Sequence, residues 1–222
     1  MVRSFCSILV LLAFAAPVVA QPPTNSLVKL RFDDGPVITE PASLVVVPDN
    51  GPAPEPRVQL DIVARDEFGA PLAGFHAFVQ FSAQATQDLC WCDIQAQENW
   101  IQANGRKIFQ AITDATGLAV FQIGAGGCVE EMGAVVLKVG ATSNPNDAVQ
   151  LRVYNVVASM DNTGAGALPC DRAVDVRDLV EYAIAHMGGP YSRCHDYDGD
   201  HVVNANDLVL YARHHVRHAT CP

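Results

Sequence analysis

The residues best suited to do chemistry lie near the end of the chain, in the stretch DYDGDHVVNAND at residues 196–207. Carboxylates gathered this closely repel one another unless a cation neutralises them. A hard cation such as Ca²⁺ takes about six to eight oxygen ligands, and the stretch offers oxygens at the spacing of an EF-hand loop. The expected ligands, at positions one, three, five, seven, nine and twelve, are Asp196, Asp198, Asp200, the carbonyl of Val202, Asn204 and Asp207. Mg²⁺ prefers fewer protein ligands in a stricter octahedron, so Ca²⁺ is the predicted ion.

This acidic loop belongs to the second copy of a sequence repeat. Residues 174–186 and 203–215, offset by 29 positions, share a valine, Asp-Leu-Val, Tyr-Ala and a final histidine. Agreement at one register indicates a duplicated structural unit. Leucine, tyrosine and alanine recur at helical spacing, which predicts two short amphipathic helices that pack on each other, each entered through an aspartate-rich loop.

The two loops depart from an ideal calcium loop in different ways. His201 stands at position six, where a sharp backbone turn favours glycine, so we expect some conformational cost. In the first copy the same offset puts Ala167, Pro169 and Asp171 at positions one, three and five, and then Asp175 and Asp178 at positions nine and twelve. Because two side-chain ligands are missing, we expect this copy to keep its helix and to lose the ion or bind it weakly.

The second loop resembles the duplicated calcium-binding repeat of dockerin modules, whose pattern is D-x-[ND]-G-D-x-x-[VI]-[ND]-x-x-D-[LV]. Gly188-Gly189-Pro190 precedes the loop where an ordinary EF-hand has a helix, which favours the dockerin variant. The resemblance spans about residues 167–220 and implies calcium binding and docking to a cohesin-like protein domain. It places partner contacts at positions ten and eleven of each loop, which are Ala205 and Asn206 in the second copy and Val176 and Arg177 in the first.

The larger, N-terminal part of the chain carries the pattern of a β-sheet protein. Apolar and polar residues alternate over 58–65, 75–82 and 149–154, with turn residues between these segments. The pattern predicts a two-sheet sandwich over residues 26–158, without helices among the strands. The stretches ARDEFGAPLAG (64–74) and TDATGLAVF (113–121) resemble two hairpin motifs of bacterial immunoglobulin-like domains. The expected fold is therefore mainly β: an immunoglobulin-like β-sandwich plus a small α module.

The beginning of the chain indicates export. Arg3, an apolar run at 8–16 and small residues at 18–20 predict a secretory signal peptide over residues 1–20, and the run is too short to span a membrane comfortably. Without the signal peptide the net charge is 13 − 24 = −11, which disfavours nucleic acid and anionic membranes as partners. We expect a secreted or cell-surface protein in which a linker (159–166) joins the sandwich to a dockerin-like module (167–222).

Six cysteines remain after the signal peptide: Cys90, Cys92, Cys128, Cys170, Cys194 and Cys221. In an exported chain an even number indicates disulfides, although six cysteines allow fifteen pairings. The spacing of Cys90 and Cys92 does not match a usual zinc site. Three cysteines fall in each half, so either one bond crosses between the halves or each half keeps an odd thiol. We expect a bond from Cys90 or Cys92 to Cys128, and one from Cys170 to Cys194 or Cys221.

Other residues suggest alternative sites. His214 and His218 lie one turn apart on the final predicted helix and could bind a transition metal, but a solvated helix end is favoured. Trp91 and Trp100 flank a loop and could stack on sugar rings, which makes a glycan a possible partner. The sequence has no nucleophile-elbow, zinc-protease or phosphate-loop motif, so we predict that the protein is not an enzyme.

The sequence therefore predicts a secreted, non-catalytic protein that binds calcium and docks another protein. A carbohydrate-binding or accessory component of extracellular polysaccharide degradation, or a surface structural protein, are the alternatives.

Overall fold

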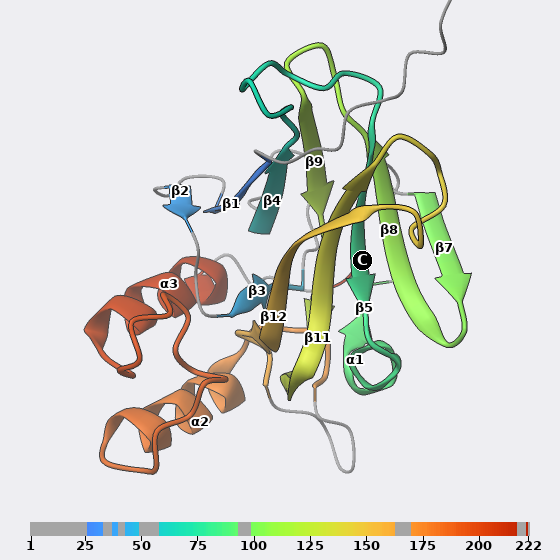
Figure 1. Cartoon of the computed structure of the whole chain (residues 1–222). Coiled ribbons are helices and arrows are strands. Elements are labelled where there is room, and N and C mark those ends of the chain that lie inside the picture. The colour runs from blue at the N-terminus through green and yellow to red at the C-terminus, as the bar shows by residue number, and fades with distance from the viewer. Residues whose placement is uncertain are drawn as a thin grey trace, which may run out of the picture.

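The computed structural model describes residues 26–32, 37–39, 43–48, 58–92, 99–162, 170–216 and 221. The expected signal peptide, residues 1–20, lies outside these ranges. The described chain folds into two large β-sheets, a short two-stranded ribbon and a small helical part (Figure 1). The prediction of a mainly β protein with a small α part is therefore confirmed.

One large sheet has four strands in the order β2-β1-β4-β9. They are antiparallel and span Leu27–Phe32 (β1), Val37–Thr39 (β2), Val58–Val63 (β4) and Leu118–Gln122 (β9).

The other large sheet has six strands in the order β3-β12-β11-β5-β8-β7. They span Leu44–Val46 (β3), His76–Phe81 (β5), Asn99–Ala103 (β7), Arg106–Ile112 (β8), Val129–Gly140 (β11) and Val149–Ser159 (β12). Strand β3 runs parallel to β12, and the other pairs are antiparallel. The ribbon pairs β6 (Cys90–Trp91) with β10 (Ala125–Gly126).

The two large sheets face each other across one apolar core. The four-stranded sheet contributes Leu60, Ile62 and Phe121, and the six-stranded sheet contributes Val79, Phe81, Phe109 and Leu137. Trp91 packs edge-on against Phe81, with ring centroids 4.8 Å apart, and its indole N–H donates to the Thr86 carbonyl. Trp91 is therefore a core residue and does not present its ring to a sugar. The side chain of Trp100 lies outside the described part of the chain.

The sandwich also contains a short helix that the sequence pattern does not predict. Helix α1 (Ala83–Asp88) follows β5, and the Ser82 hydroxyl accepts a hydrogen bond of 2.9 Å from the Ala85 N–H. This N-cap contact fixes the start of α1. The sequence pattern does not reveal this helix, because six residues are too few to establish a helical period.

The two motifs that resemble immunoglobulin-like hairpins come together in space. The Ala64 N–H donates to the Gly117 carbonyl at 2.8 Å, and the Leu72 N–H donates to the Ala64 carbonyl at 3.0 Å. Gly117 has a φ of +79°, and a Cβ at this position would lie 2.4 Å from the Ala64 carbonyl oxygen. Only glycine allows the hairpin to approach so closely.

The helical part lies beside the β3–β12 edge of the six-stranded sheet (Figure 1). Helices α2 (Val176–His186) and α3 (Ala205–Val216) confirm the two helices predicted from the repeat. Their core contains Tyr182, Tyr197 and Tyr211, and it is completed by Val45 and Val47 from the β3 region of the sandwich. The helical part therefore shares its core with the sheets. Within the described residues, no helix is both long and apolar enough to cross a membrane.

The expected linker at 159–166 begins with residues that the structure describes. Ser159 is the last residue of β12, and both Met160 and Asp161 are fully buried. Residues 159–161 therefore belong to the packed structure. Residues 163–169 lie outside the described ranges.

Three disulfides connect the sheets to the helical part, and they pair Cys90 with Cys170, Cys92 with Cys221 and Cys128 with Cys194. The prediction of disulfides is confirmed, but both expected pairings are wrong, because every bond crosses between the halves. The β6–β10 ribbon explains the difference. It brings Cys90 opposite Gly126, so three cysteines of the first half lie at the side where the helical part packs.

A cut between the two parts should leave them covalently joined. We expect a variant with a site-specific protease sequence inserted after Gly164 to give two fragments that migrate together on a non-reducing denaturing gel and separate after reduction. The triple variant Cys90→Ser, Cys92→Ser, Cys128→Ser is the control, and its fragments should separate without reductant. Separation of the parent fragments without reductant would contradict the observed connectivity.

Candidate metal centre

The acidic loop predicted from the sequence lies between α2 and α3. Carboxylate oxygens of Asp196, Asp198 and Asp207 all lie within 4.8 Å of one another, and Asp196 and Asp207 are buried. At this distance each ionised pair repels by on the order of 3 kcal/mol at an effective dielectric constant of about 20. The structure therefore brings three of the predicted ligands together in an arrangement that favours a cation.

Backbone N–H groups of the loop fix the two buried carboxylates. Asp207 accepts from the N–H groups of Tyr197 (2.6 Å), Asp198 (3.2 Å) and Asn204 (2.8 Å). Asp196 accepts from the N–H groups of Gly199 (2.8 Å) and His201 (2.9 Å). The chain therefore wraps around these two side chains, and Asp207 in the first turn of α3 also faces the positive end of the helix dipole.

The remaining predicted ligands line the outer side of the loop. Asp200 accepts from the Val202 N–H at 2.8 Å, and the Asn204 amide nitrogen donates to Asp200 at 2.9 Å and to the Val202 carbonyl at 3.3 Å. Asp200 lies outside the close cluster of three carboxylates. The Asn204 amide oxygen accepts from the Asn206 N–H at 2.7 Å, so contacts within the loop also fix this side chain.

The expected strain at loop position six is present. His201 has a φ of +69°, in the left-handed region that residues other than glycine adopt infrequently, although histidine tolerates it better than most. Arg172, at the corresponding position of the first copy, has the same φ of +69°. Both loops therefore make the same sharp turn without glycine.

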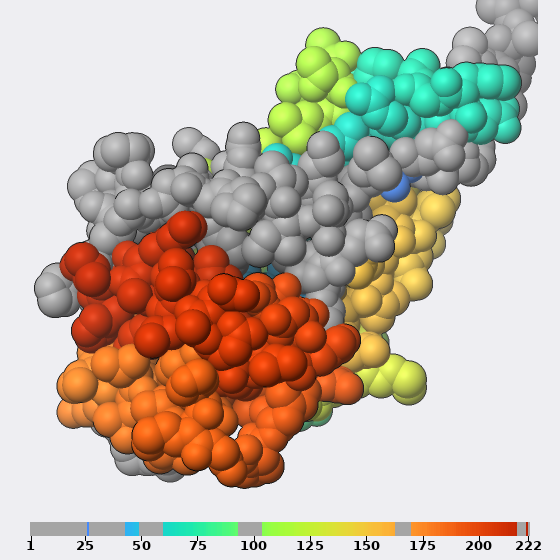
Figure 2. All heavy atoms as spheres, turned by 90° about the vertical axis from the view of Figure 1, so that its left-hand side faces the viewer, coloured from blue at the N-terminus to red at the C-terminus, as the bar shows by residue number. Residues whose placement is uncertain are grey.

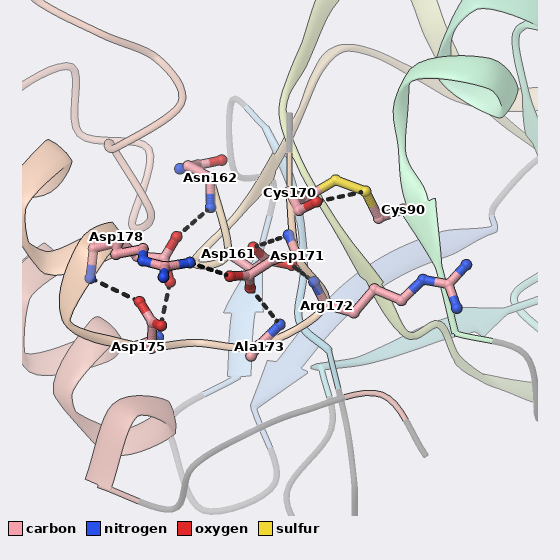
Figure 3. A network of polar contacts seen from close by, with 10 residues as sticks. Cys90, Asp161, Asn162, Cys170, Asp171, Arg172, Ala173, Asp175 and Asp178 are labelled. Atoms are coloured by element: carbon pink, nitrogen blue, oxygen red, sulfur yellow. Dashed lines mark hydrogen bonds and ion pairs between the residues drawn. A yellow bond between two sulfur atoms is a disulfide. The ribbon is translucent and has the colours of Figure 1, made fainter. Parts of the chain in front are cut away.

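Figure 3 shows the polar contacts that close the first loop, and these contacts match those of the second loop. Asp178 accepts from the N–H groups of Asn162 and Asp175, both at 2.8 Å, as Asp207 does from Tyr197 and Asn204. Asp161 accepts from the Arg172 N–H at 2.8 Å, as Asp196 does from His201. The two loops therefore share one hydrogen-bond pattern.

Asp161 is the counterpart of Asp196 in the hydrogen-bond pattern of the first loop. Asp178 and Asp207 are 29 residues apart, whereas Asp161 and Asp196 are 35 residues apart. The first loop thus contains six additional residues, and this insertion displaces the register that the constant offset predicts. Ala167 and Pro169 lie outside the described residues. Asp161 could have been recognised in the sequence as the counterpart of Asp196. A comparison of the two copies without gaps cannot find it, because the first loop is longer.

The two helices are joined by a reciprocal pair of hydrogen bonds. The Tyr211 hydroxyl donates to the Asp175 carbonyl, and the equivalent Tyr182 hydroxyl donates to the Asn204 carbonyl. Each helix therefore holds the loop of the other copy, and the tyrosine rings stack with centroids 6.2 Å apart. Because each bond ends on a loop residue, loop geometry and helix pairing depend on each other.

The predicted partner-binding residues lie in the first turns of the two helices. Val176, Arg177, Ala205 and Asn206 are all exposed, and Arg177 forms an ion pair of 3.3 Å with Asp171. The alternative histidine site has no support in the described residues, because His214 is buried and His218 lies outside them. Cys128, Glu130 and Cys194 also cluster, but the two cysteines form a disulfide.

Burial and mutual repulsion shift the titration of the buried carboxyls. Burial raises the pKa of Asp207 to about 6, and the nearby Asp198 charge adds to this effect against the opposing backbone donors. Burial likewise raises the pKa of Asp161 to about 7, with further contributions from Asp178 and Asp171. Without a cation, both loops therefore hold protons at a pH where free aspartates are ionised.

Comparison with known proteins identifies no relative. No protein-family model matches the chain, and no curated protein or solved structure is significantly similar to it.

The raised pKa values of Asp161 and Asp207 predict an unusual pH dependence of stability for the ion-free protein. Between about pH 4 and pH 7 the folded state binds more protons than the unfolded state, so the free energy of unfolding should fall by several kcal/mol as the pH rises. Urea unfolding of calcium-depleted protein at pH 4.5 and 7.5 measures this change. Asp161→Asn should flatten the profile, and an ion-free stability that rises over this window would contradict the shifts.

Proposed function

We propose that the helical part is a dockerin-like module that binds one Ca²⁺ ion in each of its two loops. The observation that carries this proposal is the hydrogen-bond pattern that both loops share around buried aspartates. The first loop is six residues longer than the second, yet both loops keep the same hydrogen-bond pattern. This is the expected result if both enclose the same ligand. The second loop would use Asp196, Asp198, Asp200, the carbonyl of Val202, Asn204 and Asp207.

The first loop offers a comparable set of oxygens. Its candidates are Asp161, Asp171, the carbonyl of Ala173, Asp175 and Asp178. The backbone at Asp171 and Ala173 supports this assignment, because the Ala173 N–H donates to Asp171 at 3.2 Å as the Val202 N–H donates to Asp200. Four carboxylates and a carbonyl suit Ca²⁺, which accepts many oxygen ligands in a flexible geometry. The proposal therefore replaces the expectation that this copy is degenerate.

We further propose that the exposed face of the two helices docks a cohesin-like domain. Helix α2 and its C-cap residue present Val176, Val180, Ile184 and Met187, which are 62%, 53%, 54% and 79% exposed and recur at helical spacing. Figure 2 shows α2 in orange and α3 in red, side by side on one face of the molecule. Contiguous apolar side chains on a surface commonly mark protein–protein contacts. The predicted contact residues Val176, Arg177, Ala205 and Asn206 are exposed in the first turns of the two helices.

In this proposal the two-sheet body is an immunoglobulin-like carrier, and the protein is secreted and non-catalytic. Three disulfides within the described chain support an oxidising, extracellular setting. The close contact between residues 64–74 and 113–121 supports the immunoglobulin-like assignment, because those are the stretches that carry the sequence resemblance.

Calorimetric titration of the full chain with Ca²⁺ tests the two loops separately. We expect two ions to bind the parent protein. Asp207→Asn and Asp178→Asn should each remove one ion, because each neutralises the carboxylate on which its loop closes. Asp66→Asn, in an exposed turn of the sandwich, is the control and should keep both. Uptake of no calcium by the parent protein would refute the metal assignment, and uptake of one ion that only Asp207→Asn removes would refute the first-loop site.

A charged substitution tests the docking face. We expect Val180→Asp to weaken binding of a cohesin-type domain by about tenfold or more, since a carboxylate would be placed in an apolar contact. Val149→Asp is the matched control, because Val149 is a 41% exposed valine on β12. Fluorescence anisotropy with a panel of labelled cohesin domains measures both variants. Equal binding by the two variants would place the contact elsewhere.

A further inference from the structure

We propose that a pocket between the helical part and the sheets binds a single pyranose ring of a glycan. The pocket has a volume of about 190 Å³ and lies where the second loop meets β12 and the residue before β3. It is lined by Ser43, Asn155, Val156, Tyr191, Arg193 and His201. None of these residues belongs to the ion ligands or to the docking face.

The lining supplies the polar groups that sugar hydroxyls require. Arg193 and His201 make no side-chain hydrogen bond or ion pair with other described residues. Asn155 uses its amide oxygen to accept from the Gly133 N–H at 2.9 Å, and its amide nitrogen has no partner among the described residues. Planar side chains with unused donors that converge on one pocket can hold a polyhydroxylated ligand in a fixed orientation.

The pocket also has an aromatic wall. Tyr191 is 47% exposed, and its hydroxyl donates to Asp196 at 2.5 Å, which fixes the ring against the loop. A pyranose ring has an apolar face of C–H groups and a rim of hydroxyls, so it fits a site that combines one aromatic ring with several polar groups. The sequence offered Trp91 or Trp100 as rings that could stack on a sugar, and in this pocket the aromatic ring is that of Tyr191.

Size and charge narrow the ligand class. A volume of 190 Å³ corresponds to roughly six water molecules in liquid water, which is the space of one sugar ring. Charges of both signs lie near the Tyr191 hydroxyl, because Asp196, Glu130 and Arg193 all act on it electrostatically. Because charges of both signs are present, the pocket suits a neutral hexose or pentose or a singly charged uronate, which share the same ring chemistry.

The pocket is connected to the second ion loop through one carboxylate. Asp196 accepts from both the Tyr191 hydroxyl and the His201 N–H, so two lining residues take their positions from a predicted calcium ligand. We therefore infer that calcium strengthens sugar binding, and this coupling, unlike the pocket itself, rests on the proposed function. A contact with the sugar would also explain why a histidine, and not a glycine, occupies position six of the loop.

Saturation-transfer NMR on the full chain tests the pocket. The probes are the methyl glycosides of glucose, galactose, mannose and xylose in one arm, and glucuronate and galacturonate in the other. We expect one member of the panel to bind the calcium-loaded protein with a dissociation constant on the order of 1 mM. Arg193→Ala and His201→Gly should each weaken this binding by about tenfold. Arg106→Ala is the control, because Arg106 lines a separate hollow on β8.

The outcomes separate the pocket from the calcium proposal. Failure of every sugar to bind, or equal loss in Arg193→Ala and Arg106→Ala, would overturn the pocket whatever the calcium titration gives. Sugar binding by a protein that takes up no calcium would support the pocket while the proposed metal function fails. Where calcium does bind, a sugar affinity that chelation leaves unchanged would overturn the coupling, and a loss of about tenfold on chelation would support it.

Discussion

Burial of the aspartate side chains at the two ends of each loop is the constraint on which the helical part depends. Asp161, Asp178, Asp196 and Asp207 are each no more than 2% exposed, and a buried charge costs free energy unless other groups compensate for it. Backbone N–H groups of the same loops compensate in part, which forces the chain to wrap tightly around the carboxylates. Because α2 and α3 begin directly behind these loops, the stacking of the tyrosines and the exposed helix face follow from the same local closure.

The helical part is an extension of the sandwich and not a separate body on a tether. Val45 and Val47 of the sandwich complete its core, the Gly127 N–H donates to the Asp161 carbonyl, and disulfides join the two parts at three points. A Cβ at Gly126 would lie 1.9 Å from an Asp161 carboxylate oxygen, so the β6–β10 ribbon packs too closely against Asp161 to carry a side chain at this position. The loops are therefore shaped partly by the sheets, which distinguishes them from loops in an independently folded calcium module.

The sequence predicts what depends on local spacing and misses what depends on tertiary packing. Alternating apolar residues locate β4 and β5, and the repeat locates α2 and α3, because these patterns depend only on residues close together in the sequence. The turn at His201 follows in the same way from the position of Gly199 and the aspartates. The role of Asp161 is hidden by an insertion of six residues, and the pairing of Cys90 with Cys170 depends on which surfaces meet. The small helix α1 is too short to give a period, and the burial of Trp91 is decided by the sheet that covers it.

The position of the three disulfides has a mechanical consequence. Cys170 lies in the first loop, Cys194 lies just before the second, and Cys221 follows α3, so each helix is bracketed by covalent anchors to the sandwich. Tension applied to either helix passes through these disulfides into β6 and the segment before β11. It does not separate the helical part from the sheets progressively from one end. The covalent anchors therefore resist separation of the helical part from the sheets under tension, and they keep the arrangement of α2 and α3 fixed relative to the sheets.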